Sequence, residues 1–511
     1  MAIPESDITT AGSQHSLAEK HSTQSQWNST SDDFDNQKSY DRGSEDAMSE
    51  ETLQGMPFEE ETSAMSKLHH GLKSLAITLL PSPISRFCGY KVEVPTRQSP
   101  TAYLDGMRGV ASFCVYLEHV AMKFHPLMFE EYGDHPYFWQ LPIIRLAFSG
   151  SVMVAIFFVI SGFALALRPL DLIYEKDWER LYRSLSSATF RRAFRIVLPP
   201  MAVTFVIMLL TRTHVFDAKY SGTVDMDLGG PIYQETFLLQ FVDWLEYVFS
   251  KLLYPYEWTV SLHNVTKSEY AAPLYTIPKE LWCSFLLFIT LTGLGRLRPV
   301  VRLGFTLFLI YYAFWCMRYD ISCFLCGMLI AEHHVRKARS IVVPKSMSRK
   351  LGSALGWSVV LFAGLWLASI PHIHGSYGST TFGFQTISAI ISWESNVFVV
   401  GSILIVWAIS NLPLLQKIFT SPIPRYLGQI SFGLYLVHWP ILASWGWRLQ
   451  PAIWKLTGND TDFNHAFGFT ISFICITPVV IFFGDLFWRV VDLGSIKLAR
   501  QLEADLIVQS L

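Results

Sequence analysis

Long runs of apolar residues, separated by short polar segments, fill most of the chain from residue 101 onward. A helix needs about 20 such residues to cross the hydrocarbon core of a bilayer. The pattern predicts about ten transmembrane helices, at residues 101–120, 142–167, 196–212, 277–295, 300–316, 319–332, 352–370, 384–410, 424–447 and 466–488. The expected fold is therefore an all-α, multi-pass integral membrane protein.

Polar segments flank this predicted transmembrane domain. Residues 1–97 are rich in Ser, Thr, Gln, Asp and Glu, so they cannot bury enough apolar surface to offset chain entropy. We expect a disordered N-terminal tail over 1–97, the transmembrane domain over 98–495, and a C-terminal tail over 496–511.

The composition agrees with a membrane protein. The 511 residues are 51% hydrophobic and only 16% charged, with a net charge of −2, whereas soluble proteins carry about a quarter charged residues. Cys323 and Cys326 form a CxxC pair inside an apolar run, where buried cysteines usually pack as small hydrophobes. We expect contact with membrane lipid and no metal site, disulfide framework or nucleic-acid partner.

Lys and Arg residues crowd the second, fourth and sixth predicted connections. Cytoplasmic loops carry such an excess, so both termini are predicted to be cytosolic. Two glycosylation sequons, at Asn264 and Asn459, fall in odd-numbered connections and should face the lumen or the outside. Whether the membrane is an endomembrane or the plasma membrane stays open.

Four ionisable residues, Asp105, Arg108, Glu118 and His119, lie in the first apolar segment, TAYLDGMRGVASFCVYLEHV. Ionisable groups inside a membrane are costly and usually functional. Arg108 and His119 are three helical turns apart, so they share a helix face at a separation of roughly 16 Å. In the alternative, Arg108 extends to the membrane interface and His119 caps the helix end.

A basic motif, RRAFRIVLPP, contains Arg191, Arg192 and Arg195 at the expected cytosolic start of the third helix. Forked guanidinium donors beside a helix N-terminus suit a phosphorylated ligand. The alternative is ordinary cytosolic charge that faces lipid headgroups.

Two later helices also carry polar candidates. Glu280, near the start of the fourth helix, would orient a histidine or a hydroxyl group, or else serve as a charge favoured by the helix dipole. Tyr435 and His438 are three residues apart and share a face, although His438 also fits an interfacial position beside Trp439. No role is assigned to Glu394.

Five segments, taken in order, resemble the acyltransferase 3 family of integral membrane O-acyltransferases, particularly its fungal branch. They are YLDGMRGVASFCVYLEH, FSGSVMVAIFFVISGFALALRPL, RRAFRIVLPP, LYTIPKELW and ISFGLYLVHWPI, and the resemblance covers residues 98–495. It implies transfer of an acyl group, often acetyl from acyl-CoA, to a hydroxyl of a carbohydrate, lipid or small secondary metabolite.

The resemblance also implies residue roles. The family's Arg-x10-His signature matches Arg108 and His119, which implies that His119 is the general base and that Arg108 positions the donor. The family's basic motif matches the three arginines of RRAFRIVLPP, expected to bind acyl-CoA. Its Trp-x4-Glu element matches Glu280, with Tyr275 in place of Trp. We expect Tyr275, with Tyr435 and His438, on the acceptor side, and acyl-CoA as co-substrate with no bound cofactor.

A second class of function remains open at this point. Intramembrane His, Arg and Glu residues also form ion and proton paths in transporters. The chain shows no clear inverted repeat or paired broken helices, which many transporters have. A receptor-like or scaffolding role would leave Arg108 and His119 without a purpose.

The loop charges generate a topology prediction. Glycosidase treatment should increase the electrophoretic mobility of the protein if Asn264 or Asn459 is modified on the lumenal or outer side. A cysteine introduced between residues 340 and 345 should not react with an impermeant thiol reagent added from outside, and its labelling would contradict the orientation.

Overall fold

The computed structural model describes residues 81–87, 100–125, 128–132, 136–217, 230–254, 269–340, 347–371, 381, 383–386 and 394–506. All of them belong to the unit Leu72–Leu511. Within the described residues the regular secondary structure is helical, and no strand occurs.

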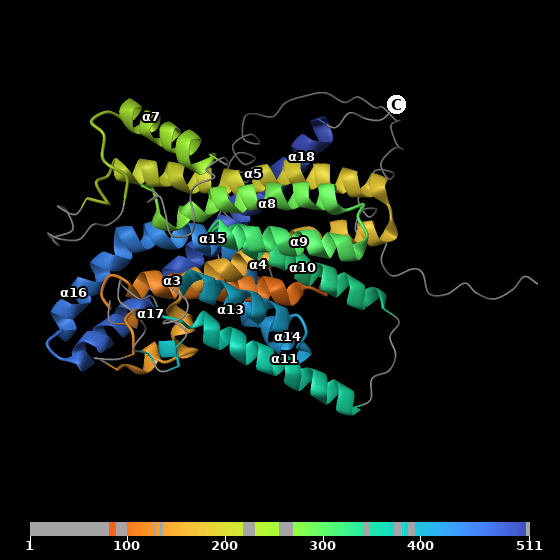
Figure 1. Ribbon diagram of the computed structural model, residues 1–511. Helices are drawn as coiled ribbons and strands as arrows, with labels where there is room; N and C mark the ends of the chain where they lie inside the picture. Colours follow the sequence, from red (N-terminus) through yellow and green to blue (C-terminus); the bar gives the residue numbers. More distant parts are fainter. Residues whose placement is uncertain are drawn as a thin grey trace, which may run out of the picture. The chain divides into compact units, whose positions relative to one another are not determined.

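Long helices dominate this unit. They are α3 (Ala102–Ala121), α4 (Gly150–Glu175), α5 (Trp178–Thr211), α8 (Thr276–Leu294), α9 (Pro299–Trp315), α10 (Tyr319–Arg339), α11 (Met347–Ala368), α13 (Glu394–Ile409), α15 (Pro422–Ile441) and α17 (Asp462–Phe487). Shorter helices are α2 (Ser82–Phe87), α7 (Phe237–Tyr247), α14 (Pro413–Phe419), α16 (Trp447–Thr457) and α18 (Leu493–Leu506). Figure 1 shows α4, α5, α8, α9 and α10 running side by side along a common direction.

Each predicted apolar segment coincides with a helix, although only part of the 384–410 segment lies within the described residues. By length and composition, five described helices can cross a membrane, or six if the bent pair α13 and α14 forms one span. The all-helical class is confirmed. The count of about ten spans and the cytosolic placement of both termini stay predictions.

The second and third predicted spans have wrong boundaries. Residues 144–148 form a 3-10 turn, so α4 begins at Gly150 rather than at 142 and continues to Glu175. Lys176 then adopts a left-handed conformation, and Asp177 caps the next helix by accepting a hydrogen bond from the Arg180 N–H. The basic connector is therefore the first half of a continuous 34-residue helix, α5.

The predicted tails also differ from the structure. Most of 1–97 lies outside the described residues, but Ser82–Phe87 forms a helix rather than a disordered segment, and Ser82 bonds to a buried carboxylate on α17. The Ser82 N–H and hydroxyl donate to Asp485 at 3.0 and 2.5 Å. At the other end, α18 crosses the predicted boundary at 495, and its Glu503 pairs with Arg191 of α5 at 3.2 Å.

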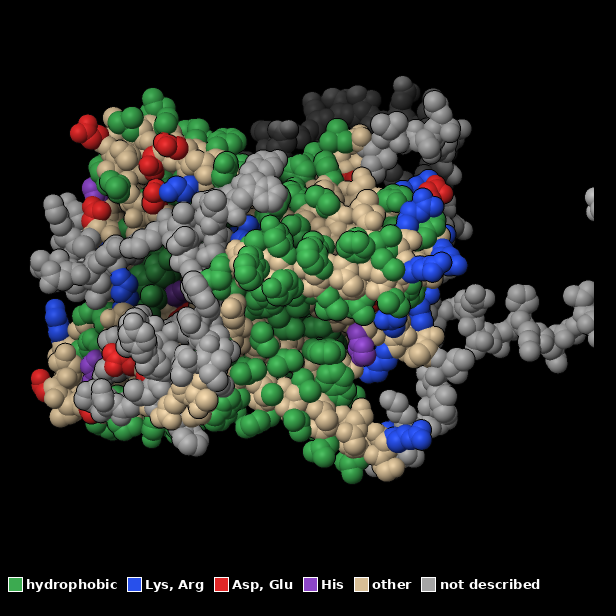
Figure 2. Space-filling view, viewed as in Figure 1, with side chains coloured by type: hydrophobic (Ala, Val, Ile, Leu, Met, Phe, Trp, Pro, Cys, Tyr) green, Lys and Arg blue, Asp and Glu red, His purple; other side chains and the backbone are tan. Residues whose placement is uncertain are grey.

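Apolar side chains point outward from several helices, as expected where lipid replaces water. The exposed ones on α9 and α11 are Val300, Val301, Phe305, Leu307, Phe308, Tyr311, Tyr312, Trp315, Leu351, Leu355, Val359 and Phe362. Figure 2 shows this apolar surface and a gathering of Lys and Arg side chains at one end of the helices. Arg339 of α10 pairs with Glu175 of α4 at 3.0 Å, which joins two of the arginine-rich connections.

Helices α3 and α15 pack in direct backbone contact. A methyl group added at Gly109 would lie 2.2 Å from the backbone nitrogen of Gly428, so no side chain fits between the helices there. Three residues further along each helix, the Ser112 hydroxyl donates to the Ser431 carbonyl at 2.9 Å. Small residues at helix contacts are typical of membrane bundles, where packing rather than hydrophobic burial drives association. The two contacts pair residues with the same sequence offset, so α3 and α15 run in the same direction with a constant register.

This contact generates a stability prediction. Gly109→Ala should lower the melting temperature of the purified protein, because the new methyl group meets backbone that cannot move aside, and overpacking typically costs about 1–3 kcal/mol. Gly304→Ala on α9, where nothing lies within 4 Å of the added carbon, is the matched control. Equal melting temperatures for the two variants would contradict the packing argument.

Candidate active site

The α3–α15 register brings two histidines together. His119 Nδ1 lies 3.0 Å from His438 Nε2, and the two rings stack with centroids 5.0 Å apart. Trp439 packs edge-on against His119 at 5.2 Å, and the Trp447 indole N–H donates to the His119 carbonyl at 3.4 Å. His438 is fully buried, whereas His119 is only half-buried. The sequence placed His438 on the acceptor side, and the structure makes it the hydrogen-bond partner of His119.

Hydrogen bonding determines which ring nitrogen of each histidine carries the hydrogen. His438 Nδ1 lies 3.0 Å from the Leu434 carbonyl, which can only accept, so Nδ1 carries the hydrogen. In a neutral ring His438 Nε2 is then an acceptor, and His119 Nδ1 must donate to it. The Nε2 atom of His119 is left with its lone pair, which is the form of imidazole that removes a proton.

Tyr435 lies beside His438. The Tyr435 hydroxyl donates to the Pro273 carbonyl at 2.8 Å and lies 2.9 Å from the Thr276 hydroxyl. The Tyr435 ring is 5.9 Å from that of His438. Tyr275 lies within electrostatic range of Tyr435. The structure therefore brings Tyr435 close to His438, with Tyr275 near Tyr435.

The predicted carboxylate on α8 is paired with an arginine of α5. Arg192 donates to Glu280 at 2.7 Å and to the Ser284 hydroxyl at 3.1 Å, and the Ser161 hydroxyl donates to Glu280 at 3.2 Å. Glu280 is also within electrostatic range of Tyr435. The ion pair thus borders the tyrosine side of the histidine pair.

Arg108 and Arg195 lie near this ion pair. Both are within electrostatic range of each other and of Arg192. The carboxylates of Asp492 and Glu280 share this region. Among the described residues neither Arg108 nor Arg195 forms an ion pair, Arg108 Nε has no hydrogen-bond partner, and Arg195 is exposed. Neither guanidinium forms a direct ion pair, although the Asp492 carboxylate lies within electrostatic range of both.

Arg191 lies one turn before Arg195 on the same face of α5. Its partner is Glu503 of α18, and 43% of its side chain is exposed. The sequence also placed the arginine motif beside a helix N-terminus. Since α5 begins at Trp178, thirteen residues earlier, the helix dipole does not assist these side chains.

Sequence reasoning missed four polar residues of the candidate site: Ser161, Thr276, Ser284 and Asp492. Small hydroxyl residues are frequent in membrane helices and give no signal of their own. Asp492 ends the π-helical segment Trp488–Asp492 that follows α17, and as a carboxylate among apolar residues in WRVVDLG it was a usable signal.

The remaining predicted sites have different outcomes. Asn459 is exposed in the loop before α17, whereas Asn264 lies outside the described residues. Glu394 begins α13, and its side chain is also outside them. In the described part of the chain, no group of three or more His, Cys, Asp or Glu residues is placed to hold a metal ion.

Comparisons with known proteins agree on one family. Residues 101–489 match the family described as Acyltransferase domain. The chain is 28% identical to the O-acetyltransferase PaAT-1 of Phomopsis amygdali over 431 residues, covering 78% of this chain and 84% of the relative. It is 26% identical to acyltransferase R4 of a Phoma species, covering 80% and 97%, and 24% identical to acyltransferase clz18 of Cochliobolus lunatus, covering 78% and 95%. No solved structure matches the chain.

Proposed function

The chain belongs to the acyltransferase 3 family of membrane enzymes that transfer acyl groups other than aminoacyl groups, and we propose that it moves an acyl group from acyl-CoA to a hydroxyl. Acetyl is the proposed group because one relative is named an O-acetyltransferase. The observation that carries the mechanism is the hydrogen-bonded pair of His119 and His438, which leaves one basic nitrogen on a half-buried ring.

In the proposed reaction, His119 Nε2 removes the proton of the acceptor hydroxyl as its oxygen attacks the thioester carbonyl carbon. The ester C–O bond forms and the C–S bond breaks. The CoA thiolate then receives from His119 the proton that came from the acceptor hydroxyl. The proton on His119 creates an imidazolium whose Nδ1–H still donates to His438. His438 is therefore a positioning residue that orients His119 and supports the charged form.

Arg108 and Arg195 are proposed to hold the phosphates of the donor. They come from α3 and α5, so a bound phosphate group would connect the helix that carries the base to its neighbour. Charge-assisted bonds from guanidinium groups are about twice as strong as neutral hydrogen bonds. Arg192 is already bound to Glu280, so its proposed role is to hold α5 against α8 beside the donor.

His119→Ala should abolish acyl transfer, since loss of a general base typically costs about 10²- to 10⁴-fold in rate. The measurement is transfer from labelled acetyl-CoA by purified protein in detergent, without an ion gradient, to a panel of hydroxyl compounds. Expression and thermal stability of the variant should match those of wild type. Solute flux by wild-type protein, without turnover of any acyl-CoA, would favour a transporter instead.

His438 variants test the positioning role separately. His438→Gln keeps an acceptor for the His119 Nδ1–H, whereas His438→Ala removes it. We expect kcat to fall more in the alanine variant, with the apparent KM of acetyl-CoA little changed. Equal kcat values in the two variants would contradict the positioning role of His438.

Arg195→Gln should raise the apparent KM of acetyl-CoA by about ten-fold, because it removes a charge-assisted contact to the donor phosphates. Arg191→Gln is the matched control on the same helix, since Arg191 pairs with Glu503, and its KM should stay within about two-fold of wild type. A larger effect from Arg191 than from Arg195 would contradict the proposed contact between Arg195 and the donor phosphates.

A further inference from the structure

Helix α7 packs on α5 near the end of the bundle that lies opposite the gathering of Lys and Arg side chains, as Figure 1 and Figure 2 show in the same view. A five-residue π-helical segment, Val248–Leu252, continues α7. At 1.5 Å per residue the two together are about 24 Å long, whereas the hydrocarbon core of a bilayer is roughly 30 Å thick. Helix α7 is therefore too short to cross a membrane.

The outer face of α7 is apolar, and its inner face carries polar groups. Leu238, Val242 and Phe249 are spaced four and seven residues apart, so they share one face, and they are 69%, 50% and 66% exposed. The buried face includes Gln240 and Trp244. A helix on a water-covered surface normally has the opposite arrangement, with its apolar face turned inward. The outer face of α7 thus suits an apolar medium.

The polar groups on the inner face of α7 have partners within the protein. Gln240 accepts a hydrogen bond from the Gln234 N–H at 3.0 Å and donates to the Ile232 carbonyl at 3.2 Å. The Trp244 indole N–H donates to the Thr204 hydroxyl of α5 at 3.1 Å. Polar groups that leave water are costly unless they are hydrogen-bonded. These groups meet that condition without water.

The outer face of α7 continues an exposed apolar surface of α5. Thr204 lies seven residues before Thr211, where α5 ends, so Trp244 contacts α5 about 10 Å along the helix axis from that end. Phe205 and Val206 are exposed in this part of α5, and the Phe205 ring packs edge-on against Trp244 at 5.2 Å. Since α5 is long and apolar enough to cross a membrane, the surface that α7 extends is one that faces lipid.

The carboxylates of α7 lie away from its apolar face. Asp243 accepts a hydrogen bond from the Tyr270 hydroxyl at 2.8 Å. Glu246 is exposed and lies about 80° around the helix from Leu238. It therefore marks the edge of the apolar face, where a helix that lies in a membrane surface meets the polar headgroups.

The contacts at the two ends of α7 connect it to neighbouring helices. Arg212, directly after α5, donates to the carbonyl of Gln234, shortly before α7. Lys251, in the π-helical segment, pairs with Glu269, shortly before α8, at 3.3 Å. Figure 1 shows the end of α5 and the start of α8 at the same end of the bundle. The chain thus reaches and leaves α7 from one side.

We propose that α7 is embedded in the membrane at this end of the bundle without crossing it, and that Leu238, Val242 and Phe249 contact lipid acyl chains. Amphipathic helices of this kind bury their apolar face at the boundary between headgroups and acyl chains. The connection between α5 and α8 then includes a membrane contact in addition to its polar segments. This inference is independent of acyl transfer.

Site-specific fluorescence tests the lipid contact. In full-length protein, Cys316→Ser and Cys475→Ser remove the exposed cysteines of the described residues, and one cysteine is introduced by Leu238→Cys or Phe249→Cys. The new cysteine is labelled with bimane, and the same protein without it is the blank. The protein is placed in nanodiscs of phosphatidylcholine that carries a nitroxide quencher on its acyl chain, and iodide is the quencher in water.

Two exposed positions serve as references. Val206→Cys on α5 reports lipid, and Asp460→Cys in the loop before α17 reports water. We expect the nitroxide lipid to quench the labels at Leu238→Cys and Phe249→Cys as strongly as at Val206→Cys, and iodide to quench them less than at Asp460→Cys. Quenching by iodide alone would place α7 in water, and protection from both quenchers would indicate a covering protein segment. Either result would overturn the proposal.

A pair of substitutions on α7 provides a second test. Val242→Glu should lower the melting temperature of the protein in lipid nanodiscs, because it places a charge in an apolar medium. Glu246→Gln, one turn further along, is the matched control and should leave the melting temperature as in wild type. If Val242→Glu melts at the wild-type temperature, the residue faces water and the proposal is wrong.

Discussion

The backbone contact between α3 and α15 is the constraint on which the site depends. From Gly109 and Gly428, where the helices touch, His119 and His438 lie ten residues further along their respective helices, and the bond from Ser112 to Ser431 keeps the same offset. In two helices that run in the same direction, residues that lie equally far along the chain from a contact face each other again after whole turns. The close approach sets the separation of the helix axes, and that separation places two imidazole nitrogens at hydrogen-bonding distance.

Arginines inside the bundle fall into two groups, those in direct ion pairs and those without one. Arg302 with Glu332, Arg318 with Asp320 and Arg192 with Glu280 form short ion pairs, and the first two are almost fully buried. Such pairs offset the cost of taking charge out of water and favour one arrangement of the helices. Arg108 and Arg195 form no such direct ion pair within the described residues, although the Asp492 carboxylate lies within electrostatic range of both. The absence of a direct pair distinguishes the proposed donor site from the structural arginines.

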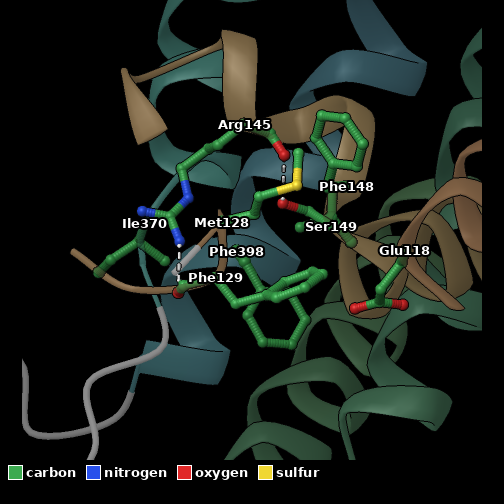
Figure 3. Close-up of a pocket in the computed structure, with 9 residues that line it drawn as sticks. Glu118, Met128, Phe129, Arg145, Phe148, Ser149, Ile370 and Phe398 are labelled. Atoms are coloured by element: carbon green, nitrogen blue, oxygen red, sulfur yellow. Dashed lines mark hydrogen bonds between the residues drawn. The ribbon is translucent and has the colours of Figure 1, made fainter. Parts of the chain in front are cut away.

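The two sides of α3 differ in character. Toward α5 and α8 lies a continuous set of polar groups, from Arg195 through Glu280 and Tyr435 to the histidines. Toward α4 and α13 lies a largely apolar pocket that Glu118 borders (Figure 3). Consecutive residues on a helix point about 100° apart, so Glu118 and His119 serve different surroundings from adjacent positions.

The sequence by itself determined the helical class, the approximate helix positions and the family, because apolar runs and intramembrane charges are local signals. Only the tertiary structure decided which of these residues meet. His438 contacts His119 across 319 positions of sequence, and the residue spacing within either helix does not predict that contact. Likewise, Arg191 and Arg192 are adjacent in one motif, yet the rotation of α5 turns one toward Glu503 and the other toward Glu280. The physical reason is that sequence spacing tells which residues share a helix face, whereas packing against other helices decides which face points inward.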